Sequence, residues 1–129
     1  SFLTNDDVKL LYGKLIRDDH IDESDRTAVV EYLTFFETIY LLMHRDVIDI
    51  RIIDDLFRYR FFVAVNNTDV QDLELLPDAR FYRNIYTLDH IWTGYRAKRG
   101  EPETSATSLR ARNPDYESYV RTGRRGRRR

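Results

Sequence analysis

The chain has 129 residues, of which 42% are hydrophobic and 33% charged, and it contains no cysteine. This length corresponds to one ordinary domain of roughly 100 to 150 residues, so a second full domain is not expected. The lack of cysteine excludes disulfides, thiolate metal sites and cysteine nucleophiles, and it is typical of a cytoplasmic or other reducing compartment. The chain has few residues that break helices, 5 Gly and 3 Pro, and many large aromatic residues for packing, 9 Tyr and 7 Phe. This composition favours helices over a β fold with many turns.

Hydrophobic periodicity predicts a series of helices along the chain. They cover residues 5–17, 24–44, 50–65 and 79–98, with a short helix over 68–75 before the last. Asp49 is expected to cap the third helix, and Asn66 is expected to help end it because asparagine tolerates the left-handed conformation. Gly100 is expected to stop the fourth.

The apolar stripes of these helices predict a common core. Its expected members are Leu33, Phe36, Tyr40, Ile53, Leu56, Phe57, Ile85, Leu88 and Trp92. Short connections at 45–49 and 66–67 favour antiparallel neighbours. The expected fold is therefore all-α, a compact antiparallel bundle of about four helices formed by residues 1–100.

The net charge of −1 is unevenly distributed along the chain. Residues 1–100 carry 13 Lys or Arg and 18 Asp or Glu, a net charge of −5, whereas residues 101–129 carry 8 and 4, a net charge of +4. Six arginines fall near the C-terminus: Arg121, Arg124, Arg125, Arg127, Arg128 and Arg129. Such a run repels itself and buries little, so residues 101–129 are expected to form an extended or disordered tail. Within it, Tyr116, Tyr119 and Val120 either form one amphipathic turn that docks on the bundle or remain part of the tail.

A set of positions in the middle of the chain carries a resemblance to a known family. These positions are Phe35, Phe36, Glu37, Ile39, Val47, Ile48, Asp49, Leu56, Phe57, Arg60, Phe61, Tyr82, Ile85, Leu88, Trp92, Tyr95 and Arg96. Over roughly residues 30–100 the chain resembles an uncharacterised family of bacterial all-helical domains. The resemblance implies an all-helical domain that is sometimes found behind a membrane anchor, and it implies no activity. The arginine-rich end is not part of that family's pattern.

No apolar run in the sequence is long enough to cross a bilayer. The longest, Phe61–Val65, is far short of the roughly 20 residues that a spanning helix needs. The sequence has no initiator methionine and no basic start followed by an apolar region, so it leaves an N-terminal targeting or anchor segment open.

Glu37 and Arg60 are the candidates for a structural ion pair. Glu37 lies beside the apolar stripe of the helix at 24–44, and in a hairpin with the helix at 50–65 it falls one turn from Arg60. A half-buried carboxylate needs a partner. We therefore expect these two side chains to fix the register of the hairpin.

The sequence provides no recognisable metal, cofactor or small-molecule site. His20, His44 and His90 lack the spacing that places two rings on one helical face. The paired acids at 6–7, 18–19 and 54–55 are expected to be solvated, since neighbours on a helix point about 100° apart. No phosphate-binding loop, dinucleotide fingerprint or nucleophile elbow occurs.

Aromatic and cationic residues alternate near the end of the last long helix. One interpretation of Trp92, Tyr95 and Arg96 is a surface that stacks on nucleic acid. The other is that the aromatic side chains belong to the core and the cations complement the helix C-terminus. The second interpretation is favoured because both features are common in helical bundles.

These observations predict a non-catalytic binding or assembly module, a subunit or accessory component of a larger complex. The expected partner-binding residues are Arg96, Lys98 and Arg99 together with Arg121, Arg124, Arg125, Arg127, Arg128 and Arg129. An acidic protein surface is the favoured partner, with nucleic acid and an anionic membrane surface as alternatives. A second alternative is an enzyme with an unrecognised Asp, Tyr and Arg site.

Overall fold

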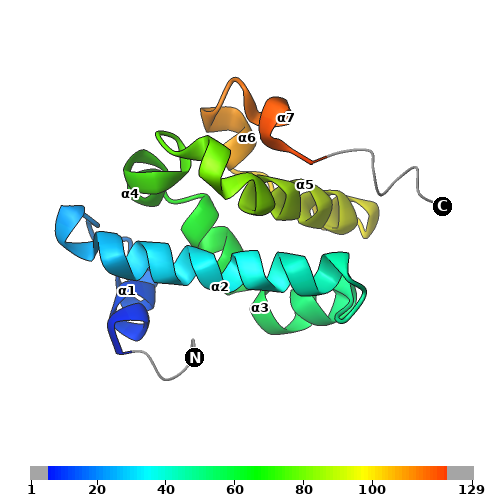
Figure 1. Ribbon diagram of the computed structural model, residues 1–129, viewed down its shortest axis with the longest axis horizontal. Helices are drawn as coiled ribbons and strands as arrows, with labels where there is room; N and C mark the ends of the chain where they lie inside the picture. The colour runs from blue at the N-terminus through cyan, green and yellow to red at the C-terminus, as the bar shows by residue number, and fades with distance from the viewer. Residues whose placement is uncertain (1–5, 122–129) are drawn as a thin grey trace.

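The computed structural model describes residues 6–121, and every regular element within them is helical (Figure 1). The α-helices are α1 (Asp6–Arg17), α2 (Arg26–His44), α3 (Ile50–Val65), α4 (Thr68–Val70), α5 (Arg83–Lys98), α6 (Leu109–Arg112) and α7 (Tyr116–Tyr119). The other elements are the 3₁₀ turns η1 (Glu23–Asp25) and η3 (Ala79–Tyr82) and the π-helical turn η2 (Gln71–Leu75). The expected all-α class is confirmed, and the four long predicted helices are present, the last as η3 followed by α5.

Local side-chain chemistry sets where the helices begin. Asp22 accepts from the backbone N–H of Ser24 at 3.0 Å, and the backbone N–H of Asp22 donates to Asp25 at 3.1 Å. This reciprocal pair starts η1, which continues into α2. Asp49 accepts from the N–H of Arg51 at 2.7 Å and caps α3 as expected.

Three residues that follow long helices have left-handed backbone conformations. Asp18 follows α1 with a φ of 58°, Asp46 follows α2 with a φ of 60°, and Gly100 follows α5 with a φ of 77°. Helix α3 ends before Asn66 as expected, but the expectation of a left-handed conformation there is wrong, because the φ of Asn66 is −94°. Asn67 instead begins the next helix, where its side chain accepts from the N–H of Val70 at 2.9 Å.

Helix α2 is central to the packing and contacts α1, α3 and α5. In Figure 1, α2 and α5 run side by side across the view, whereas α1 lies at a steep angle to them. The short helices α6 and α7 lie on the far side of α5 from α2. The arrangement therefore has more elements, and a less regular course, than the expected antiparallel bundle of about four helices.

Aromatic rings join the three helices at the middle of the core. Phe36 of α2 meets Phe61 of α3 edge to face at 5.2 Å between ring centroids. Phe61 stacks on Trp92 of α5 at 4.7 Å, and all three side chains are fully buried. Burial of such large rings contributes strongly to the stability of the fold.

Of the expected core residues, Leu56 lies outside the core and Phe57 packs at its edge, with its ring 6.2 Å from that of Phe36. Leu33, Phe36, Tyr40, Ile53, Ile85, Leu88 and Trp92 are buried as expected. Leu56 is 56% exposed, and Phe57 is only partly buried. The buried arc of α3 is centred near Phe61. At about 100° per residue Leu56 lies roughly 140° from Phe61, whereas Phe57 lies roughly 40° from it.

The expectation that the chain is extended or disordered from residue 101 onwards is wrong for residues 109–121. Leu109, Tyr116 and Val120 are 0%, 2% and 5% exposed, and α7 packs against α5 and η3. The amphipathic turn that the sequence left open is thus formed and docked. The arginines from Arg124 onwards lie outside the described residues.

Alanine substitutions should separate the buried ring of α2 from the exposed leucine of α3. Phe36→Ala is expected to lower the free energy of unfolding by about 3 to 5 kcal/mol, because it empties a fully enclosed site. Leu56→Ala should change it by less than about 0.5 kcal/mol. Urea denaturation of dilute protein measures both, and equal losses in the two variants would contradict the assignment of these faces.

Candidate interaction surface

Helix α3 presents a second apolar face to solvent. Ile52, Leu56 and Tyr59 are 50%, 56% and 56% exposed, and Val63 is partly buried one turn further on. We call these four residues the α3 stripe. At about 100° per residue they fall within roughly 60° of the helix circumference. An amphipathic helix in a domain usually has polar residues on this side, so the apolar face needs an explanation.

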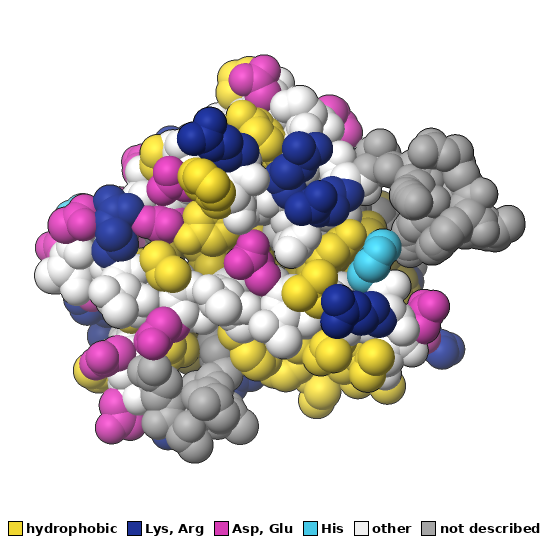
Figure 2. Space-filling view, in the orientation of Figure 1, with side chains coloured by type: hydrophobic (Ala, Val, Ile, Leu, Met, Phe, Trp, Pro, Cys, Tyr) yellow, Lys and Arg dark blue, Asp and Glu magenta, His cyan; other side chains and the backbone are white. Residues whose placement is uncertain are grey.

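Charged residues border the α3 stripe. On one side the guanidinium of Arg60 lies over the ring of Tyr12 in α1, 5.1 Å from its centroid. On the other side Asp55 is exposed and forms no ion pair within residues 6–121. Figure 2 shows hydrophobic side chains gathered along the lower edge of the molecule, where Figure 1 has α3. An apolar centre with a charged border is the usual composition of a protein interface.

A hollow of about 400 Å³ adjoins the C-terminal end of the α3 stripe. Tyr59, Phe62 and Val63 form its α3 side, and Leu15 of α1 lies among its other lining residues. The surface there is concave and partly apolar, so it can receive a side chain from outside the molecule.

Arg96 does not lie on the surface. Its guanidinium Nη1 donates to both carboxylate oxygens of Asp54 at 3.2 Å, and its Nε lies 2.9 Å from a carboxylate oxygen of Glu103. The indole N–H of Trp92 donates to the same Asp54 at 2.8 Å. Arg96 and Asp54 are each 7% exposed. Arg96 is therefore occupied within the fold and is removed from the residues expected to contact a partner.

This network also corrects the expectation for one pair of acids. Asp55 is exposed as expected, but its neighbour Asp54 faces the core. The angle of about 100° between adjacent residues accounts for the difference, because it turns one of them inwards. The partner of the buried carboxylate is 42 positions away along the chain, which is why the sequence did not indicate it.

The other expected cations have different positions. Lys98 and Arg99 are exposed at the end of α5, and Arg99 donates to the hydroxyl of Tyr95 at 2.7 Å. Arg121 is exposed, but its backbone N–H donates to Thr87 of α5 at 2.8 Å. Arg124, Arg125, Arg127, Arg128 and Arg129 lie outside the described residues.

The structure does not bring Glu37 and Arg60 together. Arg60 lies over Tyr12, as described above, and its backbone carbonyl accepts from the hydroxyl of Tyr32 at 2.8 Å. Burial raises the pKa of Glu37, while the charge of Arg121 acts in the opposite direction. The cation that acts on the pKa of Glu37 is thus Arg121 of the C-terminal segment, not Arg60 of α3.

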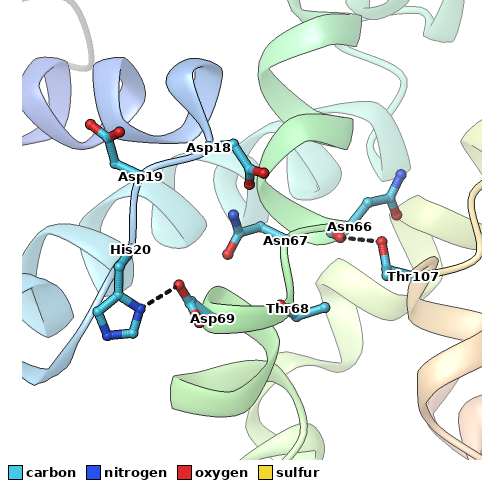
Figure 3. A pocket seen from close by; sticks show the side chains of 8 residues that line it. All are labelled: Asp18, Asp19, His20, Asn66, Asn67, Thr68, Asp69 and Thr107. Carbon is cyan, nitrogen blue, oxygen red and sulfur yellow. Dashed lines mark hydrogen bonds and ion pairs between the residues drawn. The ribbon is translucent and has the colours of Figure 1, made fainter.

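A polar pocket of about 490 Å³ lies between the end of α1 and the α3–α4 connection (Figure 3). Its lining residues are Asp18, Asp19, His20, Asn66, Asn67, Thr68, Asp69 and Thr107. His20 Nδ1 lies 3.1 Å from Asp69, and the other ring nitrogen points away from Asn67 in Figure 3. Asp69 also accepts the backbone N–H of Ile21 at 2.9 Å. These contacts fix the loop between α1 and α2.

The histidines are spread over three places in the fold. His20 lies in the polar pocket, His44 stacks on Tyr40 at 5.7 Å, and His90 Nδ1 lies 3.3 Å from a guanidinium nitrogen of Arg110. Within residues 6–121 no three His, Asp or Glu side chains are grouped so that they could hold a metal ion.

A second buried carboxylate holds the C-terminal segment on α5. Asp89 is 4% exposed and accepts the hydroxyl of Tyr116 in α7 at 2.6 Å. Burial raises the pKa of Asp89 to about 6, although the hydrogen bond from Tyr116 acts in the opposite direction. Asn113 donates to the hydroxyl of Tyr86 at 2.9 Å and adds a second polar link.

Comparison of the chain with protein-family models, curated proteins and solved structures gives no match. The resemblance to the bacterial helical family therefore depends on the sequence positions quoted above alone. Among the described helices none is sufficiently long and apolar to cross a membrane.

Removal of Arg96 should be strongly destabilising. Arg96→Ala is expected to lower the free energy of unfolding by about 3 to 5 kcal/mol, because it leaves the carboxylate of Asp54 buried without its cation. Arg99→Ala, at an exposed cation of the same helix end, should cost less than about 0.5 kcal/mol. Thermal or urea denaturation compares the two, and a small loss in both would place Arg96 on the surface after all.

The raised pKa of Asp89 predicts a dependence of stability on pH. The folded protein holds the Asp89 proton more tightly than the unfolded chain, whose ordinary pKa is 3.8. Its contribution to stability is therefore present in acid and is lost as the pH rises through about 6. Asp89→Asn should be more stable than the unsubstituted chain at pH 8 by up to about 3 kcal/mol, and the difference should vanish near pH 3.5.

The exposed Asp46→Asn is the control for this comparison, since asparagine also tolerates the positive φ at that position. Denaturation curves of the three proteins at several pH values provide the measurement. A difference between Asp89→Asn and the unsubstituted chain that does not change with pH would contradict the role of this carboxyl group.

Proposed function

We propose that this chain is a non-catalytic assembly module that docks on a protein through the α3 stripe. The observation that carries the proposal is the exposure of Ile52, Leu56 and Tyr59, each at least half exposed on one face of a well-packed helix. Contiguous apolar surface of this kind marks interaction sites in soluble domains. Tyr59 is of a residue type that is enriched among those that dominate the binding energy of interfaces.

The basic C-terminal end supplies a second contact in this proposal. The backbone of Arg121 is hydrogen-bonded to Thr87 of α5. The six arginines from Arg121 onwards favour an acidic surface as their partner. Lys98 and Arg99 are exposed cations near the end of the same helix. A partner with an apolar patch and an acidic region fits both features.

Burial of the aromatic side chains favours a protein over nucleic acid as the partner. Trp92 is 0% exposed and Arg96 is paired with Asp54, so the stacking surface considered from the sequence is not available. A nucleic-acid contact would depend on the C-terminal arginines alone, whereas residues 1–100 carry a net charge of −5 and would repel phosphates.

Site-specific photo-crosslinking in the organism that produces the chain tests this function. A photoreactive amino acid replaces Leu56 in the full chain, and the matched control carries it at Ala111, exposed on α6. Figure 1 places α6 on the opposite side of the molecule from α3. We expect a discrete protein adduct from position 56 and none from position 111. The absence of an adduct at 56, or equal adducts at both positions, would overturn the proposal.

A further inference from the structure

We propose that the hollow beside the α3 stripe receives a basic side chain, an arginine or a lysine, of the partner protein. The inference rests on the proposed function, because it states the chemistry of the segment that docks there. It follows from the residues that line the hollow, from the charges of its two carboxylates and from the apolar surface that continues from it.

The lining of the hollow is partly apolar and partly acidic. Tyr59, Phe62 and Val63 of α3 supply apolar surface, and Asp18 and Glu103 supply two carboxylates. Among the lining residues that the structure describes, none is a lysine or an arginine. A long basic side chain has the same two-part character, since its aliphatic stem packs on apolar surface while its charged head needs polar partners.

The negative charge of Glu103 is only partly balanced within the fold. Its carboxylate lies 2.9 Å from Nε of Arg96, but the same guanidinium also donates to both carboxylate oxygens of Asp54. One cation therefore serves two carboxylates. The side chain of Glu103 remains 26% exposed, so the excess negative charge of this group acts on the hollow and favours a further cation there.

Asp18 supplies the second carboxylate from a different segment, the end of α1. It is exposed and forms no ion pair within residues 6–121. Asp18 and Asn67 line both the hollow and the polar pocket, so the two spaces adjoin. In Figure 3 the carboxylate of Asp18 points toward Asn67, whereas that of Asp19 points away from it. Asp18 can therefore meet a charged group that enters the hollow.

The α3 stripe indicates that this basic group belongs to a protein segment. From Tyr59 at the hollow, exposed apolar surface continues along the helix to Leu56 and Ile52. A small free cation would leave that surface uncovered. A protein segment with apolar side chains on the stripe covers it, and a basic residue at the end that meets Val63 then reaches the carboxylates.

Nuclear magnetic resonance of the full, isotope-labelled chain tests the inference with the peptide acetyl-Leu-Leu-Arg-amide. We expect saturable shifts of the backbone signals of Tyr59, Val63 and Asn67. The matched peptide carries citrulline, which has the shape of arginine without its charge, and it should bind about two- to fivefold more weakly. The absence of shifts at these residues, or equal affinities of the two peptides, would overturn the inference.

Removal of the Asp18 charge should weaken binding of the arginine peptide by about two- to fivefold. Asp18→Asn suits this test because asparagine tolerates the φ of 58° at this position. Asp46→Asn is the matched control, since Asp46 is also exposed and has a φ of 60°, but follows α2 at the opposite end of α3 from the hollow. Equal affinities of the two variants would overturn the contact with Asp18.

Sedimentation equilibrium of the full chain tests a second copy as the source of the basic side chain. We expect Asp18→Asn and the unsubstituted chain to have the same association state at every protein concentration. A dimer that Asp18→Asn weakens would indicate that basic residues of a second copy fill the hollow, and it would overturn the assignment to a partner protein.

The two proposals can fail separately. Equal affinities of the arginine and citrulline peptides, together with an adduct from position 56, overturn the basic side chain and leave the docking function intact. Binding of the arginine peptide at the hollow, without an adduct from position 56, overturns the docking function and with it the partner protein as the source.

Discussion

Helix α5 is buried on several sides, so each polar side chain that it encloses needs a partner from another segment. Trp92 and Arg96 meet Asp54 of α3, Asp89 meets Tyr116 of α7, and the hydroxyl of Tyr86 donates to the carbonyl of Leu75 at 2.6 Å. These hydrogen bonds fix where α3, η2 and α7 pack around α5. The rest of the fold, including the exposed face of α3, depends on that placement.

The period of the apolar residues was sufficient to predict the long helices, because that signal is local. It was insufficient to distinguish the buried face of α3 from the exposed one. Apolar residues lie on both faces, and the sequence pattern does not show which of them packs against α2. The sequence alone therefore predicts a core position for Leu56, which is exposed. The docking of residues 109–121 was equally hidden, because it depends on Asp89, which is 27 positions from Tyr116.

The charged residues were the least predictable part of the candidate site. Composition correctly indicates an acidic body, yet it does not distinguish a solvated carboxylate from one that is buried with a distant cation. Asp54 and Asp55 are neighbours with opposite environments. The sequence pattern places Arg96 in one group with Arg99, although only Arg99 is exposed. A contact between residues 42 positions apart leaves no mark on the local sequence pattern.

The hydrogen bond between the backbone N–H of Arg121 and Thr87 gives the arginine run a fixed origin. Because α7 and α3 lie on opposite sides of the molecule (Figure 1), a partner bound at the α3 stripe would leave the surface around Arg121 accessible. The chain would then have two separate contacts with one complex, so that binding through the α3 stripe raises the effective concentration of the basic segment near an acidic surface of that complex.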